Sequence, residues 1–168
     1  MTSVSIRLEH QGDAAAIRTV HKAAFPTDAE TKLVDALRES GRLSLSLVAE
    51  CGGRVVGHVA FSPVAVERKP VGWGLAPLSV TPEVQRRGVG RRLVEEGLAL
   101  ARDAGIPFVV VLGHPEYYPR FGFQTAGDVG LANVYGADEA FMVVELRPGG
   151  IPKGGGLAKY CEEFDAWG

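Results

Sequence analysis

The stretch "VTPEVQRRGVGRRLVEEG", residues 80–97, joins two apolar segments and decides how the rest of the chain is interpreted. The residues before it, "GWGLAPLSV", have the composition of a strand, and "RRLVEEGLALARDAG" has the apolar spacing of a helix. A loop with two glycines thus lies where a strand turns into a helix. The first N–H groups of a helix have no intrahelical acceptor, and glycine lets an anion approach them closely. The stretch therefore indicates either an anion site or an ordinary basic loop.

Composition bounds the alternatives. The chain has 168 residues, of which 46% are hydrophobic and 23% are charged, as in ordinary soluble globular proteins. The net charge of −2 provides no general positive field that would attract nucleic acid or an anionic membrane. We expect a single domain over residues 1–168, with the glycine-rich residues 149–168 as a C-terminal arm.

The two cysteines, Cys51 and Cys161, are far apart and have no metal-ligand spacing, so we expect reduced thiols and no metal. No apolar run reaches the ~18 residues of a membrane helix, and the first residues lack the order of a signal peptide. These features predict a cytoplasmic protein that does not bind a membrane.

Periodicity predicts an α/β domain with a mixed sheet. Helices are expected after Asp13 as a cap, and from a capping box at Thr27 and Glu30 to Gly41. Pro63 is expected to mark a bulge or the end of regular pairing. Strands are expected within residues 3–9, 43–50, 54–66, 72–80, 106–113 and 140–148.

Two motifs carry a resemblance to a known family. The loop lacks the Gly-Lys-Ser/Thr ending of a P-loop and the third glycine of a dinucleotide fingerprint. What remains, Q-x-x-G-x-G after a strand, resembles the acetyl-CoA diphosphate loop of the GNAT superfamily of N-acetyltransferases. Further on, "HPEYYPRFGF" (residues 114–123) resembles the tyrosine segment that follows the fifth strand in that family. With "FMVVEL", these motifs are similar to the YhbS-like branch of predicted acetyltransferases.

The resemblance implies a GNAT-like fold: one mixed, mostly antiparallel sheet of about six or seven strands, flanked by helices, with splayed central strands. It also implies acetyl-CoA as cosubstrate, with no metal. Backbone groups of the strand end would pair with the pantetheine arm, and the loop would hold the diphosphate. The cofactor-binding residues implied are Leu78, Ser79, Val80, Gln85, Arg86, Arg87, Gly88, Val89, Gly90 and Arg91.

The implied reaction is direct attack of a neutral amine on the thioester. Tyr118 matches the proton-donating tyrosine of the family, although a packing tyrosine is the alternative. The base is open between His114, which stands near the family's usual asparagine position, and Glu83 at the loop. Each has an ordinary alternative, a strand-end hydrogen bond for His114 and helix-start charge for Glu83. His21 and His58 are interpreted as satisfied core histidines, and His10 as part of a loop.

The expected function is therefore acetyl transfer from acetyl-CoA to an amine of a small molecule or peptide, by a monomer or homodimer. A CoA-binding sensor without turnover is the main alternative. Nucleic-acid binding through the arginines of residues 86–92 is disfavoured by the net charge of −2. The first two helices, the usual acceptor side in this superfamily, give no clear acidic cup that would identify the acceptor.

Overall fold

The computed structural model describes residues 3–166, which form two compact units. Within the described residues, unit 1 consists of residues 3–61, 77–97 and 163–166, and unit 2 of residues 62–76 and 98–162. Four elements contribute residues to both units, because the chain crosses between the units along them: β3 (Arg54–Val66), β4 (Lys69–Val80), α3 (Val89–Asp103) and the 3₁₀ helix η4 (Glu162–Ala166).

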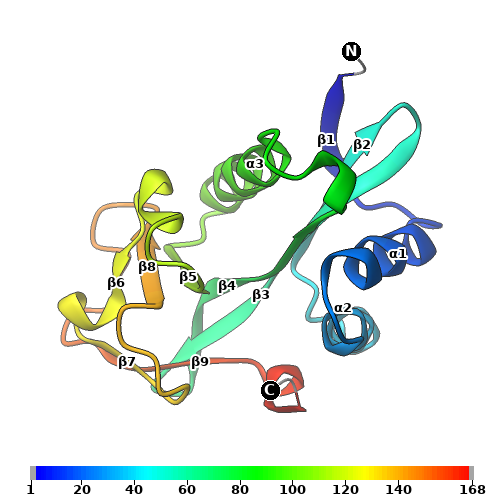
Figure 1. The fold of residues 1–168 in the computed structure, drawn as a ribbon. Coiled ribbons are helices and arrows are strands. Elements are labelled where there is room, and N and C mark those ends of the chain that lie inside the picture. The colour runs from blue at the N-terminus through cyan, green and yellow to red at the C-terminus, as the bar shows by residue number, and fades with distance from the viewer. Residues whose placement is uncertain (1–2, 167–168) are drawn as a thin grey trace. The chain divides into compact units, whose positions relative to one another are not determined.

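Unit 1 contains strands in the order β1-β2-β3-β4 (Figure 1). The strands β1 (Val4–Leu8) and β2 (Leu45–Cys51) are antiparallel, as are β2 and β3. The β2–β3 register shifts between Ala49 and Glu50. Most residues of β2 are buried, which is why its sequence reads as an apolar run rather than as a strict alternation.

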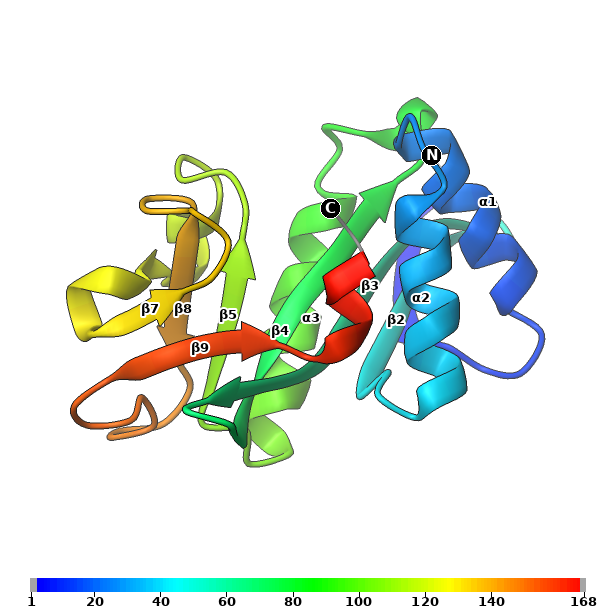
Figure 2. The same ribbon diagram turned by 90° about the horizontal axis from the view of Figure 1, so that it is seen from below.

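Helices cover both faces of the unit 1 strands. On β3, a Cβ at Gly57 would meet Leu93 of α3, whereas the next side chain, His58, contacts His21 of α1 (Ala14–Ala24). Since successive strand residues point to opposite faces, α1 and α3 lie on opposite sides of β3. Figure 2 shows α1 beside α2 (Ala29–Ser40). The apolar faces of these two helices bury Ile17, Val20, Leu33, Val34 and Leu37.

The helix ends differ in part from the prediction. Asp13 stands at the N-cap of α1, but its carboxylate accepts hydrogen bonds from Arg7 and from the N–H of His10 instead of capping the helix. The N-cap of α2 is Asp28 rather than Thr27. Gly41 ends α2 with φ +78°, in the left-handed region that favours glycine, as predicted.

Unit 2 contains strands in the order β3-β4-β5-β8-β6. The strand β5 (Phe108–Leu112) runs parallel to β4 and antiparallel to β8 (Phe141–Glu145), and the short β6 (Gln124–Thr125) pairs with β8. The β4–β5 ladder joins Trp73–Leu75 to Val109–Val111, three residues on each strand. All but the last residue of β5 are buried, as its continuous apolar sequence predicts.

Pro63 lies at a change of partner and not at the end of a strand. β3 pairs with β2 as far as Phe61 and with β9 (Gly156–Tyr160) from Val64 onward, and it continues without interruption between them. Because proline cannot donate to a ladder, the gap between the two partners is where β3 tolerates it. The expectation of a bulge or an end at Pro63 was therefore only partly right.

Several short elements were absent from the sequence prediction. The segment expected as an arm, residues 149–168, forms β9 and then the 3₁₀ helix η4 (Glu162–Ala166), while residues 167–168 lie outside the described residues. β9 also pairs in parallel with β7 (Leu131–Asn133), and η3 (Ala126–Val129) precedes β7. With these pieces the sheet of residues 3–166 has nine strands, and it is mixed and mostly antiparallel as predicted.

Candidate functional site

The loop between β4 and α3 begins with the short helix η1 (Pro82–Val84) in unit 1. The N–H of Thr81 donates to the carbonyl of Val56 on β3, with an N···O distance of 2.8 Å. The side-chain Nε2 of Gln85 donates to the carbonyl of Val80, also at 2.8 Å. Gln85 thus fastens the loop back onto the end of β4.

Two left-handed residues shape the rest of the loop. Arg86 has φ +64° and Gly88 has φ +83°. A non-glycine residue in this region costs about 1–2 kcal/mol, which makes Arg86 a position of local strain. A Cβ at Gly88 would meet nothing within 4 Å, so the space beside Gly88 is open and the positive φ alone favours glycine there.

The start of α3 offers donors to this open space. The carbonyl of Gly88 accepts the N–H of Arg92 at 3.1 Å, so the helix ladder begins there. The N–H groups of Val89, Gly90 and Arg91 lie in the first turn and have no acceptor inside the helix. Val89 is itself only 3% exposed, so its side chain serves the core while its N–H remains at the helix start. This arrangement can bind an anion.

The arginines of the loop have different environments. Arg86 and Arg87 are exposed, next to the open space at Gly88. Arg91 forms an ion pair with Glu95, with an N···O distance of 3.6 Å, and Arg92 donates to the carbonyl of Val4. Arg92 therefore has a structural contact, and Arg86 and Arg87 are the side chains best placed to meet a ligand.

The other residues predicted to bind the cofactor lie at the end of β4, also in unit 1. Leu78 and Val80 are half-buried, while Ser79 is 4% exposed. The Oγ of Ser79 lies 2.9 Å from Nδ1 of His21. Ser79 therefore has a side-chain partner that its place in the motif did not indicate.

Tyr118 belongs to unit 2 and begins η2 (Tyr118–Phe121). Its side chain is buried, and its ring has edge-to-face contacts with Tyr117 and Phe123, with centroid distances of 5.1 and 5.6 Å. Burial, with a smaller effect of Tyr117, raises the pKa of Tyr118 well above that of a tyrosine in water. The phenol therefore stays protonated at neutral pH, which suits a proton donor and equally suits a packing residue.

The two candidate bases are both exposed. Glu83 lies in η1 of unit 1, and His114 follows β5 in unit 2. The carbonyl of His114 accepts the N–H groups of Tyr117 and Tyr118, at 3.0 and 3.3 Å, so its backbone shapes the tyrosine turn. No described contact of either side chain marks it as a base.

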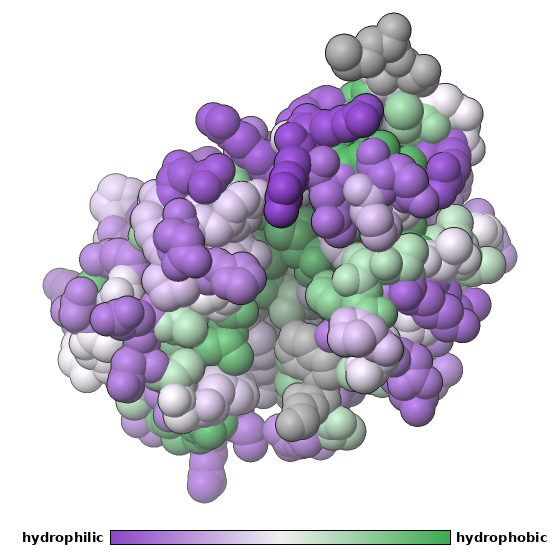
Figure 3. Space-filling view, in the orientation of Figure 1, coloured by the Kyte–Doolittle hydropathy of each residue, from purple (hydrophilic) through white to green (hydrophobic). Residues whose placement is uncertain are grey.

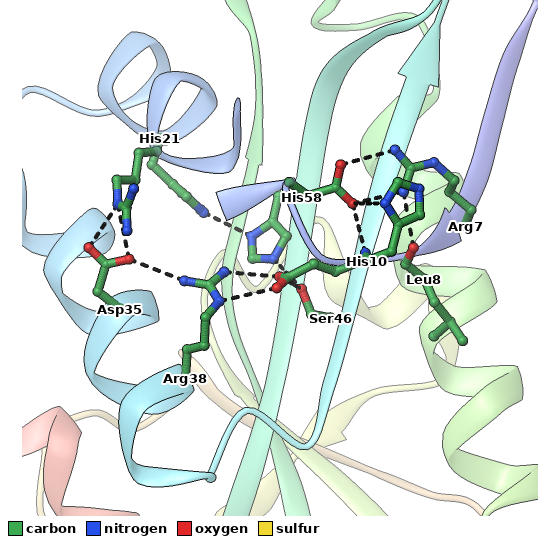
Figure 4. A network of polar contacts seen from close by, with 11 residues as sticks. Arg7, Leu8, His10, His21, Asp35, Arg38, Ser46 and His58 are labelled. Atoms are coloured by element: carbon green, nitrogen blue, oxygen red, sulfur yellow. Dashed lines mark hydrogen bonds and ion pairs between the residues drawn. The ribbon is translucent and has the colours of Figure 1, made fainter. Parts of the chain in front are cut away.

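Sequence reasoning missed a polar chain inside unit 1. His21 and His58 are buried, as predicted, but Nε2 of His21 lies 2.9 Å from Nδ1 of His58, and Nε2 of His58 lies 2.8 Å from Oγ of Ser46 (Figure 4). The only signal in the sequence for this chain was a histidine at a core position in each of two elements, His21 in α1 and His58 in β3.

Within residues 3–166, no group of three or more His, Cys, Asp or Glu side chains could hold a metal ion. Among the same residues, no helix has both the length and the apolar character needed to cross a membrane. The face of the molecule in Figure 3 carries mostly hydrophilic side chains, with smaller hydrophobic patches between them.

Comparison with known proteins identifies the family. The model of the "Acetyltransferase (GNAT) family" matches residues 14–123. The chain is 42% identical over 163 residues to the uncharacterized N-acetyltransferase YhbS of Escherichia coli K12, covering 95% of this chain and 98% of that protein.

Two solved structures have similar folds. The crystal structure of Escherichia coli YhbS in complex with CoA matches with a TM-score of 0.95 and 39% identity, covering 100% of this chain and 95% of that one. A GNAT-family acetyltransferase from Brucella melitensis in complex with acetyl-CoA matches with a TM-score of 0.83 and 39% identity, covering 97% and 99%. The fold, the YhbS-like relationship and the enzyme class expected from the sequence, an acetyl-CoA-dependent N-acetyltransferase, are confirmed. The chain belongs to the acetyltransferase (GNAT) family.

Proposed function

We propose that this protein transfers an acetyl group from acetyl-CoA to an amine of a small molecule or peptide, by direct attack of the amine on the thioester. The observation that carries the proposal is the loop at the start of α3, where Gly88, with open space beside it, directly precedes the helix-start N–H groups. The CoA and acetyl-CoA complexes of the two similar structures support the same ligand here.

The loop residues would divide the work of holding the diphosphate. Backbone N–H groups from Arg86 to Arg91 would donate to the phosphate oxygens, and the guanidinium groups of Arg86 and Arg87 would add charge. Gln85 would keep the loop in place through its bond to Val80. The backbone of Leu78, Ser79 and Val80 would pair with the pantetheine arm, and a main-chain N–H there would polarise the thioester carbonyl.

Tyr118 is proposed as the general acid on the strength of the family motif. The amine nitrogen attacks the thioester carbon, the C–S bond breaks, and the phenol gives its proton to the departing thiolate, while the proton that the nitrogen loses as the amide forms restores the phenol. A thiol has a reference pKa near ~8.5, and a tyrosine whose pKa is raised by burial is a weaker acid than that. The tyrosine would therefore hold its proton until negative charge develops on the sulfur.

The test is a panel of amines incubated with acetyl-CoA, followed by free-thiol detection and mass spectrometry of the products. Thiol release together with an amine that gains one acetyl group supports the transferase. Binding of CoA without thiol release supports the sensor. Location in the cytoplasm and a monomeric or dimeric state remain predictions from the sequence.

A further inference from the structure

A continuous chain of hydrogen bonds runs through unit 1 from Ser79 to a surface carboxylate. Its heavy-atom distances are 2.9 Å from Ser79 Oγ to His21 Nδ1 and 2.9 Å from His21 Nε2 to His58 Nδ1. They continue with 2.8 Å from His58 Nε2 to Ser46 Oγ and 2.6 Å from Ser46 Oγ to Glu9 Oε1. Figure 4 shows the middle of this chain, with the rings of His21 and His58 pointing toward each other.

The direction of the chain follows from its last member. Ser46 has one hydroxyl hydrogen and donates it to the Glu9 carboxylate, so its oxygen must accept from Nε2–H of His58. Nδ1 of His58 is then bare and accepts Nε2–H of His21. Nδ1 of His21 is bare in turn and accepts the hydroxyl hydrogen of Ser79. Every hydrogen points toward Glu9, which leaves the Ser79 oxygen as an acceptor only.

Burial keeps both rings neutral, which this direction requires. His58 is 0% exposed and His21 is 1% exposed. Desolvation, with the positive charge of Arg38, lowers the pKa of His21 to about 4, and desolvation with the charges of His21 and Arg38 lowers that of His58. Asp35 and Asp13 act weakly in the opposite direction, on His21 and His58 respectively. A neutral imidazole has one donor and one acceptor, which is what a proton-conducting chain needs.

An ionic frame holds the outer end of the chain. Two nitrogens of Arg38 donate to the two Glu9 oxygens at 3.1 and 3.0 Å, and a third donates to Asp35 at 3.1 Å. The Glu9 side chain is 16% exposed and lines an open pocket of about 350 Å³ together with Arg38 and Ser46. The frame holds the Glu9 carboxylate at the pocket, which connects it to water.

We propose that this chain conducts the proton that the acceptor amine must lose, with Ser79 as the catalytic base and His21, His58, Ser46 and Glu9 as positioning residues of the path. The proposal rests on the proposed function, in which Ser79 lies among the three β4 residues that hold the arm of acetyl-CoA. It supplies the base for which neither His114 nor Glu83 has a supporting contact.

The proton balance closes. The overall reaction, R–NH₃⁺ plus acetyl-CoA giving R–NH–CO–CH₃ plus CoA–SH, releases one H⁺. The ammonium gives a proton to Ser79 Oγ while each member of the chain passes its own hydrogen onward, so that Glu9 gains one proton and no charge stays in the core. Glu9 releases it to the pocket. The amine nitrogen loses its second proton as the amide forms, and this proton restores the Tyr118 phenol that has protonated the thiolate. The path resets when both rings return to the Nε2–H tautomer and both hydroxyls rotate.

Nitrogen-15 NMR of the histidine rings tests the direction of the chain without any substrate. At pH 7, both His21 and His58 should be neutral Nε2–H tautomers. Two Nδ1–H rings, one of each, or a charged ring would overturn the proposal even if the protein is an active acetyltransferase.

Kinetics test conduction with three variants. His58→Gln keeps a donor and an acceptor but cannot pass a proton readily, and Ser46→Ala cuts the path at a half-buried position where misfolding is least expected. Ser62→Ala is the matched control. Ser62 is a buried serine of β3, the strand that also carries His58, and its hydroxyl has no hydrogen-bond partner among the described residues. The measurement is kcat/KM against pH, with one acceptor amine of pKa near ~10 and one near ~8.

With the more basic amine at pH 7, kcat/KM should fall about 10²-fold in His58→Gln and in Ser46→Ala, while kcat/KM of Ser62→Ala should match that of the parent. The loss should shrink to within about threefold as the pH approaches the amine pKa, and it should be smaller for the weaker base. A loss that is equal at every pH and for both amines would show a structural role and overturn the proposal. An active parent with unaffected variants would do the same, whereas a parent that acetylates no amine would overturn the proposed function itself.

Discussion

Gly113 lies beneath the ring of Tyr118, so closely that a Cβ at position 113 would stand 2.5 Å from the ring's Cε2. Real side chains do not tolerate that distance, so any residue other than glycine would displace the ring. Gly113 directly follows β5 and precedes the tyrosine segment that contains η2. The position of the proposed acid therefore depends on Gly113, which directly precedes the tyrosine segment of residues 114–123.

Gly113→Ala should lower kcat by at least about 10-fold, because the proposed proton donor moves. CoA affinity should stay within about twofold, since Gly113 is not among the residues proposed to hold the diphosphate or the pantetheine arm. Gly127→Ala is the control, because a Cβ there would meet nothing within 4 Å. Steady-state kinetics and calorimetric titration with CoA would check this, and a fully active Gly113→Ala would argue against the tyrosine.

Gly88→Asp and Gly88→Asn form a matched pair at the loop. Both side chains tolerate a positive φ better than most, and both have room at this position. They differ in charge, so Gly88→Asp should bind CoA at least about 10-fold more weakly than Gly88→Asn. The difference in CoA affinity should become smaller as the salt concentration rises. Equal CoA affinities by calorimetry would place the diphosphate away from Gly88.

Stability should depend on pH through His21. Its pKa is lowered to about 4 in the folded protein, against ~6.5 unfolded, so the unfolded state binds more protons as pH falls through this range. The contribution of His21 to the free energy of unfolding is fully present above pH ~6.5 and is lost as the pH falls toward ~4. This loss amounts to roughly 2 kcal/mol between pH 7 and pH 5. Urea unfolding at the two pH values should show this loss in the parent, with a further loss in the same direction from His58.

His21→Gln should have a smaller pH dependence of its unfolding free energy than the parent. His10→Gln is the control, because the His10 side chain is 66% exposed and lies outside the buried chain. The same pH dependence in His21→Gln and in the parent would contradict the buried neutral state of this ring. Asp13, whose pKa the Arg7 guanidinium lowers to about 2, acts in a lower pH window and does not confuse the comparison.

Much of the fold could be predicted because it follows from local patterns. The apolar run of β5, the helix after Gly88 and the glycine that ends α2 depend on sequence neighbours alone. The strands β6 and β7 have two and three residues, too short for periodicity, and β9 follows a glycine-rich stretch; all three are defined by partners distant in the sequence. The prediction for Pro63 was only partly right for the same reason, since β3 exchanges β2 for β9 there.

The candidate site likewise has features that follow from local sequence and features that depend on residues distant in the sequence. The loop motif predicted glycines where a strand turns into a helix, and Gly88 has a positive φ there. The partners of Ser79 could not be predicted, because His21 and His58 come from α1 and β3, at sequence separations of 58 and 37 along the chain of contacts. Interpreted singly, each histidine is a core residue. Only the contacts of His21 with Ser79 and with His58 show that the two rings belong to one hydrogen-bonded chain.

Tyr118→Phe removes the proposed proton donor and keeps the ring contacts with Tyr117 and Phe123. The expected loss is on the order of 10²-fold in kcat, at the lower end for acid–base groups because a thiolate is already a good leaving group. KM for acetyl-CoA should barely change. Because burial raises the pKa of Tyr118, the parent should show no falling limb from this group below about pH 10. Turnover within about twofold of the parent would make the tyrosine structural.

The measurement that tests the central claim most directly is mass spectrometry of an amine panel after incubation with the parent protein and acetyl-CoA, alongside Gly88→Asp and Tyr118→Phe. We predict that at least one amine gains a single acetyl group, that one CoA thiol appears for each product molecule, and that both variants form far less product at limiting acetyl-CoA. Thiol release without any acetylated amine, or acetylation that is unchanged in Gly88→Asp, would contradict the account.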